Sequence, residues 1–239
     1  MWKMKTVLVD ERLSEKCERA LNIRGFNTIR LPRDPDLGEA VGSHPDTLLF
    51  YSGDEIITTA DYCDRVSYIF SDIREANSNI RIKFTSDKRG KEYPNDCKMN
   101  ALKIGNNIFF NPKCVSSVIA EYATEAGLKV NHVSQGYPAC TVLAFGNNAI
   151  TADRGMAESL NKAGIKVTLI EEGHISLPPY QYGFIGGASG VFGNKVYFIG
   201  NIDLHPQSEI IRAAIVDAGF EVISLCDEPL ADLGGLIFI

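Results

Sequence analysis

Short apolar runs separated by glycine with asparagine or aspartate recur along the chain. The repeats are LLFYSGDEIITT at 48–59, IGNNIFFN at 104–111, FGNNAITA at 145–152 and SGVFGNKVYFIG at 189–200. Two strand-like runs joined by Gly-Asn or Gly-Asp predict a β-hairpin, because glycine supplies the positive φ angle that a tight turn demands. The pattern therefore predicts four hairpins, with turns at Gly53, Gly105, Gly146 and Gly193.

Each hairpin is followed by a helical stretch with an apolar stripe and then by a short β-branched strand. The helix ends at Ala-Gly in 121–133, 158–170 and 212–225, as is typical of a helix C-terminus. Asn111, which precedes a proline, is a predicted N-cap for one of these helices, and Asp153 or Thr151 is the predicted N-cap for the next. The repeated unit is therefore strand, hairpin, strand, helix, strand, or ββαβ.

The two ends of the chain complete the pattern. Residues 5–31 have the sequence of the second half of a unit, and LGGLIFI at 233–239 has that of a first strand. If residues 236–239 pair antiparallel with residues 6–9, a fifth unit is assembled from both termini and the ring closes without a free sheet edge. We therefore predict an α/β propeller of five ββαβ units, with residues 1–239 as a single domain.

Composition narrows the class of protein. The chain has 239 residues, 45% of them hydrophobic, and a formal net charge of -6, which argues against a nucleic-acid partner. No apolar run approaches membrane-spanning length, and the N-terminus has no signal-peptide pattern. The six cysteines lack C-x-x-C spacing, which is typical of reduced thiols. These features predict a cytoplasmic protein, with no membrane partner and an undetermined oligomeric state.

Most of the candidate reactive groups fall at equivalent places in the repeat. In every unit the loop that enters the first strand lies opposite the hairpin turn, so these loops should converge on one face. They are GSHPDT at 42–47, EYPNDC at 92–97, QGYPAC at 135–140, EEGHISLPPYQYG at 171–183 and CDEPLADLGG at 226–235. The strand-to-helix junctions add Asp10, Asp153 and Asp203. A ligand site built from convergent polar side chains is expected at this face.

The repeated ββαβ unit, the split fifth unit and the segment EEGHISLPPYQYGFIGGASGVFGNKVYFIG at 171–200 together resemble the pentein fold of the guanidino-group-modifying enzymes. More narrowly, the chain resembles an uncharacterised family of bacterial proteins of clostridial type assigned to that fold. It is distantly similar to the dimethylarginine dimethylaminohydrolases and amidinotransferases. The resemblance implies a cysteine nucleophile, a histidine acid/base and carboxylates that hold a guanidinium.

The chain departs from those enzymes at the nucleophile. Their cysteine lies in the final strand, where this sequence has Gly234 and Gly235, and their Gly-Gly-Asp motif is absent. The resemblance therefore implies a relocated site, with catalytic and substrate-binding candidates as follows: Cys140 as nucleophile, His174 as acid/base, and His44, Asp46, Cys97 and Asp232 as substrate-binding residues, Cys97 being a second candidate nucleophile.

Two functions follow from this comparison. The first is a hydrolase or transferase that acts on a guanidino or amidino C-N bond of a small molecule. The second is a pentein without catalysis that binds a small cation or a protein, and the missing C-terminal cysteine favours it. His44 before Pro45 also fits a simple turn, and a metal site from His44, His174, His205 and a cysteine lacks any ligand spacing. No metal or other cofactor is predicted.

Overall fold

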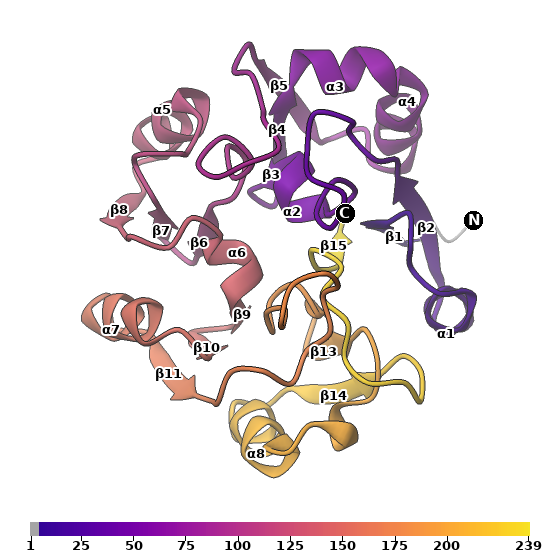
Figure 1. Ribbon diagram of the computed structural model, residues 1–239, viewed down its shortest axis with the longest axis vertical. Helices are drawn as coiled ribbons and strands as arrows, with labels where there is room; N and C mark the ends of the chain where they lie inside the picture. Colours follow the sequence, from indigo (N-terminus) through magenta and orange to yellow (C-terminus); the bar gives the residue numbers. More distant parts are fainter. Residues whose placement is uncertain (1–4) are drawn as a thin grey trace.

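The computed structural model describes residues 5–239, and these form five three-stranded sheets arranged around a common centre (Figure 1). Four of the sheets are continuous in sequence. The first of these units contains α2 (Pro45–Leu48), β3 (Leu49–Tyr51), β4 (Glu55–Thr59), α3 (Ala60–Arg65), α4 (Ser67–Ala76) and β5 (Arg81–Thr85), and the second contains β6 (Leu102–Ile104), β7 (Asn107–Phe110), α5 (Ser117–Glu125) and β8 (Lys129–His132). The third contains α6 (Pro138–Thr141), β9 (Val142–Phe145), β10 (Asn148–Thr151), α7 (Arg154–Lys162) and β11 (Lys166–Leu169). The fourth contains β12 (Ser189–Phe192), β13 (Lys195–Phe198), η1 (Ile202–Leu204), α8 (Ser208–Asp217) and β14 (Glu221–Ser224).

The fifth sheet is built from both ends of the chain, as predicted. It contains β15 (Ile237–Phe238), β1 (Lys5–Asp10) and β2 (Phe26–Leu31), with α1 (Glu15–Ile23) between β1 and β2. Strand β15 runs antiparallel to β1, with Val7 opposite Phe238. Ile237 and Ile239 pack into one apolar cluster, whereas Leu236 and Phe238 pack into another. The C-terminal strand therefore joins two parts of the core, because its alternate side chains enter different clusters.

The hairpins and most helix ends match the sequence pattern. Gly105 and Gly146 have φ angles of 56° and 57°, which a residue with a side chain rarely adopts. Asp153 caps α7, since its carboxylate accepts a hydrogen bond from the backbone N-H of Met156 at 2.8 Å. The turns between paired strands are therefore set by local sequence.

The predicted helix start at Asn111 is wrong. Helix α5 begins at Ser117 and is capped by Ser116, whose hydroxyl accepts from the Val118 N-H. The Asn111 amide oxygen instead accepts from the Lys113 N-H at 3.0 Å. Asparagine readily forms such a turn with the backbone two residues later, and this turn competes with helix capping.

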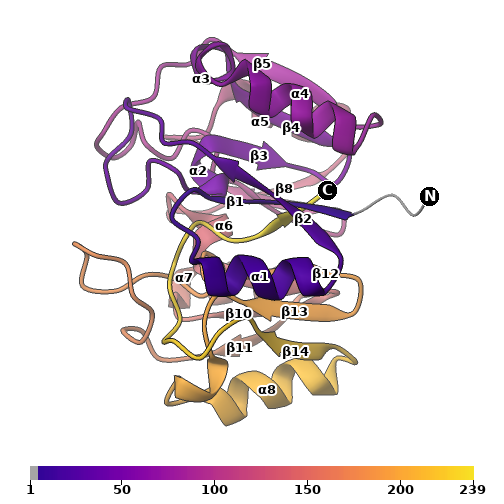
Figure 2. The same ribbon diagram turned by 90° about the vertical axis from the view of Figure 1, so that its right-hand side faces the viewer.

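Helices α1, α5, α7 and α8 lie on the outside of the ring, and the sheets face inward (Figure 1). Figure 2 shows long loops that extend from one side of the ring, near α2 and α6. Within residues 5–239, no helix has the length and apolar character needed to cross a membrane.

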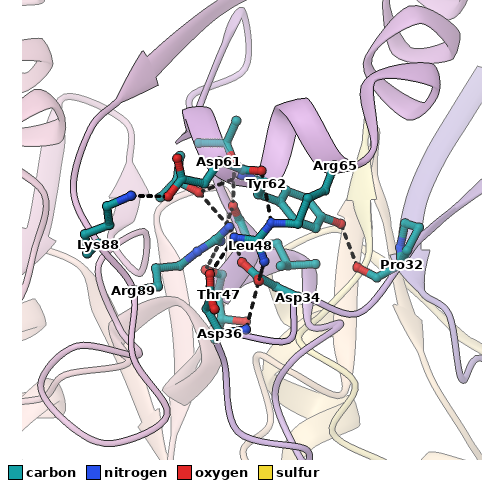
Figure 3. A network of polar contacts seen from close by, with 12 residues as sticks. Pro32, Asp34, Asp36, Thr47, Leu48, Asp61, Tyr62, Arg65, Lys88 and Arg89 are labelled. Atoms are coloured by element: carbon teal, nitrogen blue, oxygen red, sulfur yellow. Dashed lines mark hydrogen bonds and ion pairs between the residues drawn. The ribbon is translucent and has the colours of Figure 1, made fainter.

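A buried arginine fastens one of these loops to α2. The Arg89 guanidinium pairs with Asp34 at 2.6 Å, and both side chains are 1% exposed. Arg89 also donates to the carbonyl oxygen of Leu48 at 3.0 Å, at the end of α2, while Arg65 donates to Asp34 (Figure 3). The loop after β5 is therefore held against the short helix that follows His44.

Candidate functional site

Three buried side chains from distant parts of the chain meet near the centre of the ring. They are His44, Cys140 and Asp232, and a donor atom from each lies within 4.8 Å of the others. His44 immediately precedes α2, Cys140 lies within α6, and Asp232 lies in the segment before β15. Both short helices have proline in the first turn, where its fixed φ angle favours helix initiation.

The thiol of Cys140 faces a carboxylate. Its Sγ lies 3.6 and 3.8 Å from the two carboxylate oxygens of Asp232. Asp232 also accepts hydrogen bonds from the backbone N-H groups of Phe184 at 2.8 Å and Gly234 at 3.1 Å. Burial raises the pKa of Cys140 well above its ordinary value, and Asp232 and Asp46 raise it further. The resting cysteine is therefore a thiol rather than a thiolate.

The imidazole of His44 lies between two carboxylates. Its Nδ1 is 3.8 Å from Asp232, and its Nε2 is 3.9 Å from Asp10. Asp10 is held in turn by Arg12, at 2.7 and 2.9 Å, and by the hydroxyl of Ser43. Burial lowers the pKa of His44, against the opposing effect of Asp232 and Asp10. A neutral imidazole between two acids is suited to accept a proton, because both neighbours stabilise the imidazolium that results.

Asp46 is the fourth member of the cluster. Its backbone N-H donates to the carbonyl oxygen of Gly234, and its own carbonyl oxygen accepts from the Asn100 amide. Burial, followed by the charge of Asp232, raises the pKa of Asp46 to about 8, although a hydrogen bond with Cys140 opposes the shift. One of its carboxylate oxygens, Oδ1, has no hydrogen-bond partner among residues 5–239. A buried acid in this state is mostly protonated at neutral pH, and a nearby cation would favour loss of that proton.

A cavity of about 600 Å³ opens onto this cluster. His44, Cys140 and Asp232 contribute to its wall, whereas Asp46 lines a separate cavity of about 270 Å³. Its other walls are rich in aromatic side chains and carboxylates: Tyr93, Tyr137, Tyr180, Tyr182, Phe184, Glu92 and Asp96. A volume of this size suits a small organic ligand, and the wall favours a cation.

Other predicted site residues lie elsewhere. His174 lines a separate cavity together with His205, and their ring centroids are 5.3 Å apart. The expected pairing of His174 with Cys140 is therefore corrected, because His44 is the imidazole beside the thiol. Cys97 is fully buried and does not line the cavity of Cys140; its Sγ donates to the Pro94 carbonyl oxygen.

Sequence reasoning missed two groups that support the cluster. Arg12 was not considered, although its position two residues after Asp10 permits the bidentate pair that forms. Tyr137, which precedes the proline of α6, is not among the predicted site residues, yet its hydroxyl donates to Asp96 at 2.6 Å. The signal for Arg12 was a cation two residues after a buried acid, whereas Tyr137 lies 41 residues from Asp96 and no local pattern links them.

The cluster also has the donor set of a metal site. Histidine nitrogen, cysteine sulfur and carboxylate oxygen are the ligands that Zn²⁺ prefers, and His44, Cys140 and Asp232 supply one of each. Within residues 5–239 no other group of three such side chains brings its donor atoms this close together. This donor set differs from the metal site considered in the sequence, because His44 is its only histidine and His174 and His205 take no part.

Residues 8–237 match the family described as a family of unknown function (DUF6873), and the chain belongs to that family. No curated protein matches the sequence. Several solved structures share the fold. A dimethylarginine dimethylaminohydrolase from Pseudomonas aeruginosa, complexed with citrulline, is 10% identical, covers 100% of both chains and has a TM-score of 0.59.

Two further enzymes extend this likeness. The amidinotransferase SxtG from Microseira wollei is 10% identical, with a TM-score of 0.56 over 97% of this chain and 89% of its own. An agmatine deiminase from C. jejuni is 10% identical, with a TM-score of 0.52 over 92% of this chain and 75% of its own. The chain therefore has the pentein fold of guanidino-group-modifying enzymes, as its repeats predict.

Proposed function

We propose that this member of the DUF6873 family is a hydrolase or transferase that breaks a C-N bond in a small guanidino or amidino compound. The observation that supports this most directly is the buried grouping of a thiol, a neutral imidazole and carboxylates against a ligand-sized cavity. Cys140 is the nucleophile in this proposal, His44 is the acid/base, and Asp232 holds the substrate cation, while Asp46 lies beside the thiol but faces a separate cavity. The structural neighbours act on compounds of this kind, which supports the choice of substrate class.

Substrate binding would change the charge around the thiol. A guanidinium is planar and donates paired hydrogen bonds to carboxylates, so Asp232, which lines the cavity, is a suitable partner. The carboxylates beside Cys140 help to raise the pKa of its thiol. A bound cation offsets their charge and lowers that pKa, so the nucleophile is formed only when substrate is present.

The proton from Cys140 would pass to His44, whose nitrogen lies within 4.8 Å of the sulfur. The thiolate then attacks the central guanidino carbon, and the electron pair of one C-N bond leaves with the departing amine, which takes the proton from His44. This step leaves an amidino carbon bonded to Cys140. Attack by water completes hydrolysis and restores the thiol, whereas attack by an amine completes a transfer.

A steric restriction at Gly234, one of the two positions that match the nucleophile of the similar enzymes, supports the relocation. Gly234 has a φ angle of 68°, and a Cβ atom built on it would lie 2.3 Å from the Cβ of His44. No side chain fits there without moving His44. Cys140 reaches the same cluster from α6 instead, so a relocated nucleophile is sterically consistent with this fold.

Turnover of a panel of guanidines and amidines tests the proposal, with release of ammonia or amine as the readout. We expect at least one compound to be converted, Cys140→Ser to abolish conversion, and His44→Gln to reduce it by 100-fold or more, on the order expected for loss of a general acid/base. Cys97→Ser is the matched control, because that thiol is also buried but lies outside the cavity. Conversion that survives in Cys140→Ser would refute the assigned nucleophile.

The second candidate is a binding module for a small cation without chemistry. The high pKa of Cys140 favours it, since a protonated thiol is a poor nucleophile. The two functions differ in one result. A binding module would retain a guanidinium ligand unchanged in the wild-type protein and bind it equally well in Cys140→Ser.

A further inference from the structure

We infer that the same cavity contains a second cation subsite, centred on Asp96, which selects guanidino compounds that also carry an amine. The guanidino half of this inference rests on the proposed function. The amine half rests on Asp96 and its neighbours alone. The ligand class is therefore an alkylguanidine with a terminal ammonium group, rather than one with a carboxylate.

Asp96 is a buried carboxylate with an unused oxygen. The residue is 5% exposed and lines the cavity. Its Oδ2 accepts a hydrogen bond from the Tyr137 hydroxyl at 2.6 Å, but its Oδ1 has no partner among residues 5–239. A buried carboxylate oxygen without a donor is unfavourable, so a ligand N-H group directed at it would be stabilised.

Two aromatic rings line the same cavity as this carboxylate. Tyr93 and Tyr137 both line the cavity, with ring centroids 6.4 Å apart and planes inclined by 48°. Burial and the neighbouring Asp96 raise the pKa of Tyr137, so its hydroxyl remains a donor to Asp96. A carboxylate combined with aromatic faces binds an ammonium ion through ion pairing and cation-π attraction together.

The subsite lies within reach of the reacting centre. Tyr137 immediately precedes α6, and Cys140 lies within the same short helix, so one helical turn connects the two groups. Both line a cavity of about 600 Å³, which is large enough for one molecule to contact Asp96 and Asp232 at once. A ligand with two cationic ends therefore matches two buried acids.

The remaining charges at the cavity wall disfavour an acidic substrate. Glu92, Asp96 and Asp232 line it, whereas Lys91 is the only lysine or arginine that does so in the part of the chain that the structure describes. A ligand carboxylate near Asp96 would meet like charge. Amino-acid substrates should thus bind more weakly than the corresponding amines.

Calorimetric titration of Cys140→Ser, which binds without turnover, tests the inference with three matched compounds. These are 4-aminobutylguanidine, butylguanidine and 4-guanidinobutyrate. We expect the amine to bind at least tenfold more tightly than butylguanidine, and the carboxylate to bind most weakly. In the background of Cys140→Ser, Asp96→Asn should remove most of the preference for the amine and leave the affinity for butylguanidine within about twofold, as expected for loss of one charge-assisted contact.

Two controls distinguish a direct contact with Asp96 from a general effect of the net negative charge of the cavity. Tyr137→Phe should weaken amine binding less than Asp96→Asn, because it removes only the supporting hydroxyl. Glu92→Gln should weaken all cations alike, because Glu92 changes the net charge without a specific contact. The subsite would be refuted if Asp96→Asn lowered the affinities for the amine and for butylguanidine equally, or lowered neither.

A simple diamine distinguishes failure of the subsite from failure of the proposed function. Binding of 1,4-diaminobutane over butylamine, lost in Asp96→Asn, supports the subsite even if no guanidine is bound or converted. That result would refute the proposed chemistry and retain the amine specificity. If neither amines nor guanidines bind at millimolar concentration to a variant that melts as the wild type does, the subsite is refuted as well.

Discussion

Replacement of Asp46 by asparagine should stabilise the protein at neutral pH. Burial raises the pKa of Asp46 from 3.8 to about 8, so folding requires this acid to take up a proton above pH 4. A raised pKa of an acid makes stability fall as pH rises from the unfolded-state value towards the folded-state value. At 1.36 kcal/mol per pH unit, the penalty reaches roughly 4 kcal/mol at pH 7. Asparagine cannot ionise, so it removes this penalty.

Denaturant titrations at pH 7 should show a free energy of unfolding about 2 to 4 kcal/mol higher for the variant than for the wild type. The gain is smaller than the full penalty because the buried amide keeps part of the desolvation cost. The corresponding rise in Tm is roughly 5 to 15 °C for a chain of this size. At pH 4 the two proteins should be nearly equal. Asp72→Asn, at an exposed position on α4, is the matched control and should change the free energy of unfolding at pH 7 by less than about 0.5 kcal/mol.

The same substitution should weaken guanidinium binding, since an amide lacks the negative charge that Asp46 can carry beside Cys140. In the wild type, binding should strengthen as pH rises from 6 to 8, because Asp46 gains that charge when it releases its proton. A variant that is less stable than the wild type at pH 7, or a difference that does not change between pH 4 and pH 8, would refute this reasoning about Asp46.

Three further outcomes are expected. Removal of residues 236–239 should expose the edge of β1 and lower Tm by more than about 10 °C, with aggregation on heating; a change within 2 °C would contradict closure through the termini. Arg89→Met should lower the free energy of unfolding by about 3 kcal/mol or more because its buried partner loses its counter-charge, whereas exposed Lys88→Met should stay within about 0.5 kcal/mol. Gly234→Ala should be more destabilising than Gly25→Ala, although both glycines have positive φ, since a Cβ atom meets His44 only at Gly234; equal denaturant midpoints would refute the steric account of the missing nucleophile.

The architecture could be predicted because its signals are local. Each hairpin depends on a Gly-Asn or Gly-Asp turn. The ring closure follows because the apolar strand at 236–239 has no hairpin partner after it and can pair with the N-terminal strand instead. The prediction at Asn111 failed because two local options, a helix cap and a side-chain turn, compete at the same residue. Tertiary context decided between them.

The site was only partly predictable because it depends on contacts between distant loops. Cys140, Asp46 and Asp232 were chosen for their places in the repeat, and these places bring them together. The choice of His174 over His44 depended on how the segment after β11 folds. Gly187 of that segment lies directly on Asp232, and a Cβ atom there would be 1.9 Å from its carboxylate. No local pattern indicates such an approach.

Covalent labelling by 2-chloroacetamidine tests the central claim most directly. The probe carries a guanidinium-like cation beside a reactive carbon, so binding at Asp232 would place that carbon at Cys140 and lower the pKa of its thiol. Peptide mass spectrometry compares all six cysteines within one sample, and neutral chloroacetamide serves as the matched reagent.

We predict that the amidine modifies Cys140 first, at least tenfold faster than chloroacetamide does, and that Asp232→Asn removes this difference, as expected when a cation is no longer held beside the thiol. Modification confined to the partly exposed Cys63 and Cys226, with Cys140 unreacted by both reagents, would contradict the assignment of Cys140 as a cation-activated nucleophile.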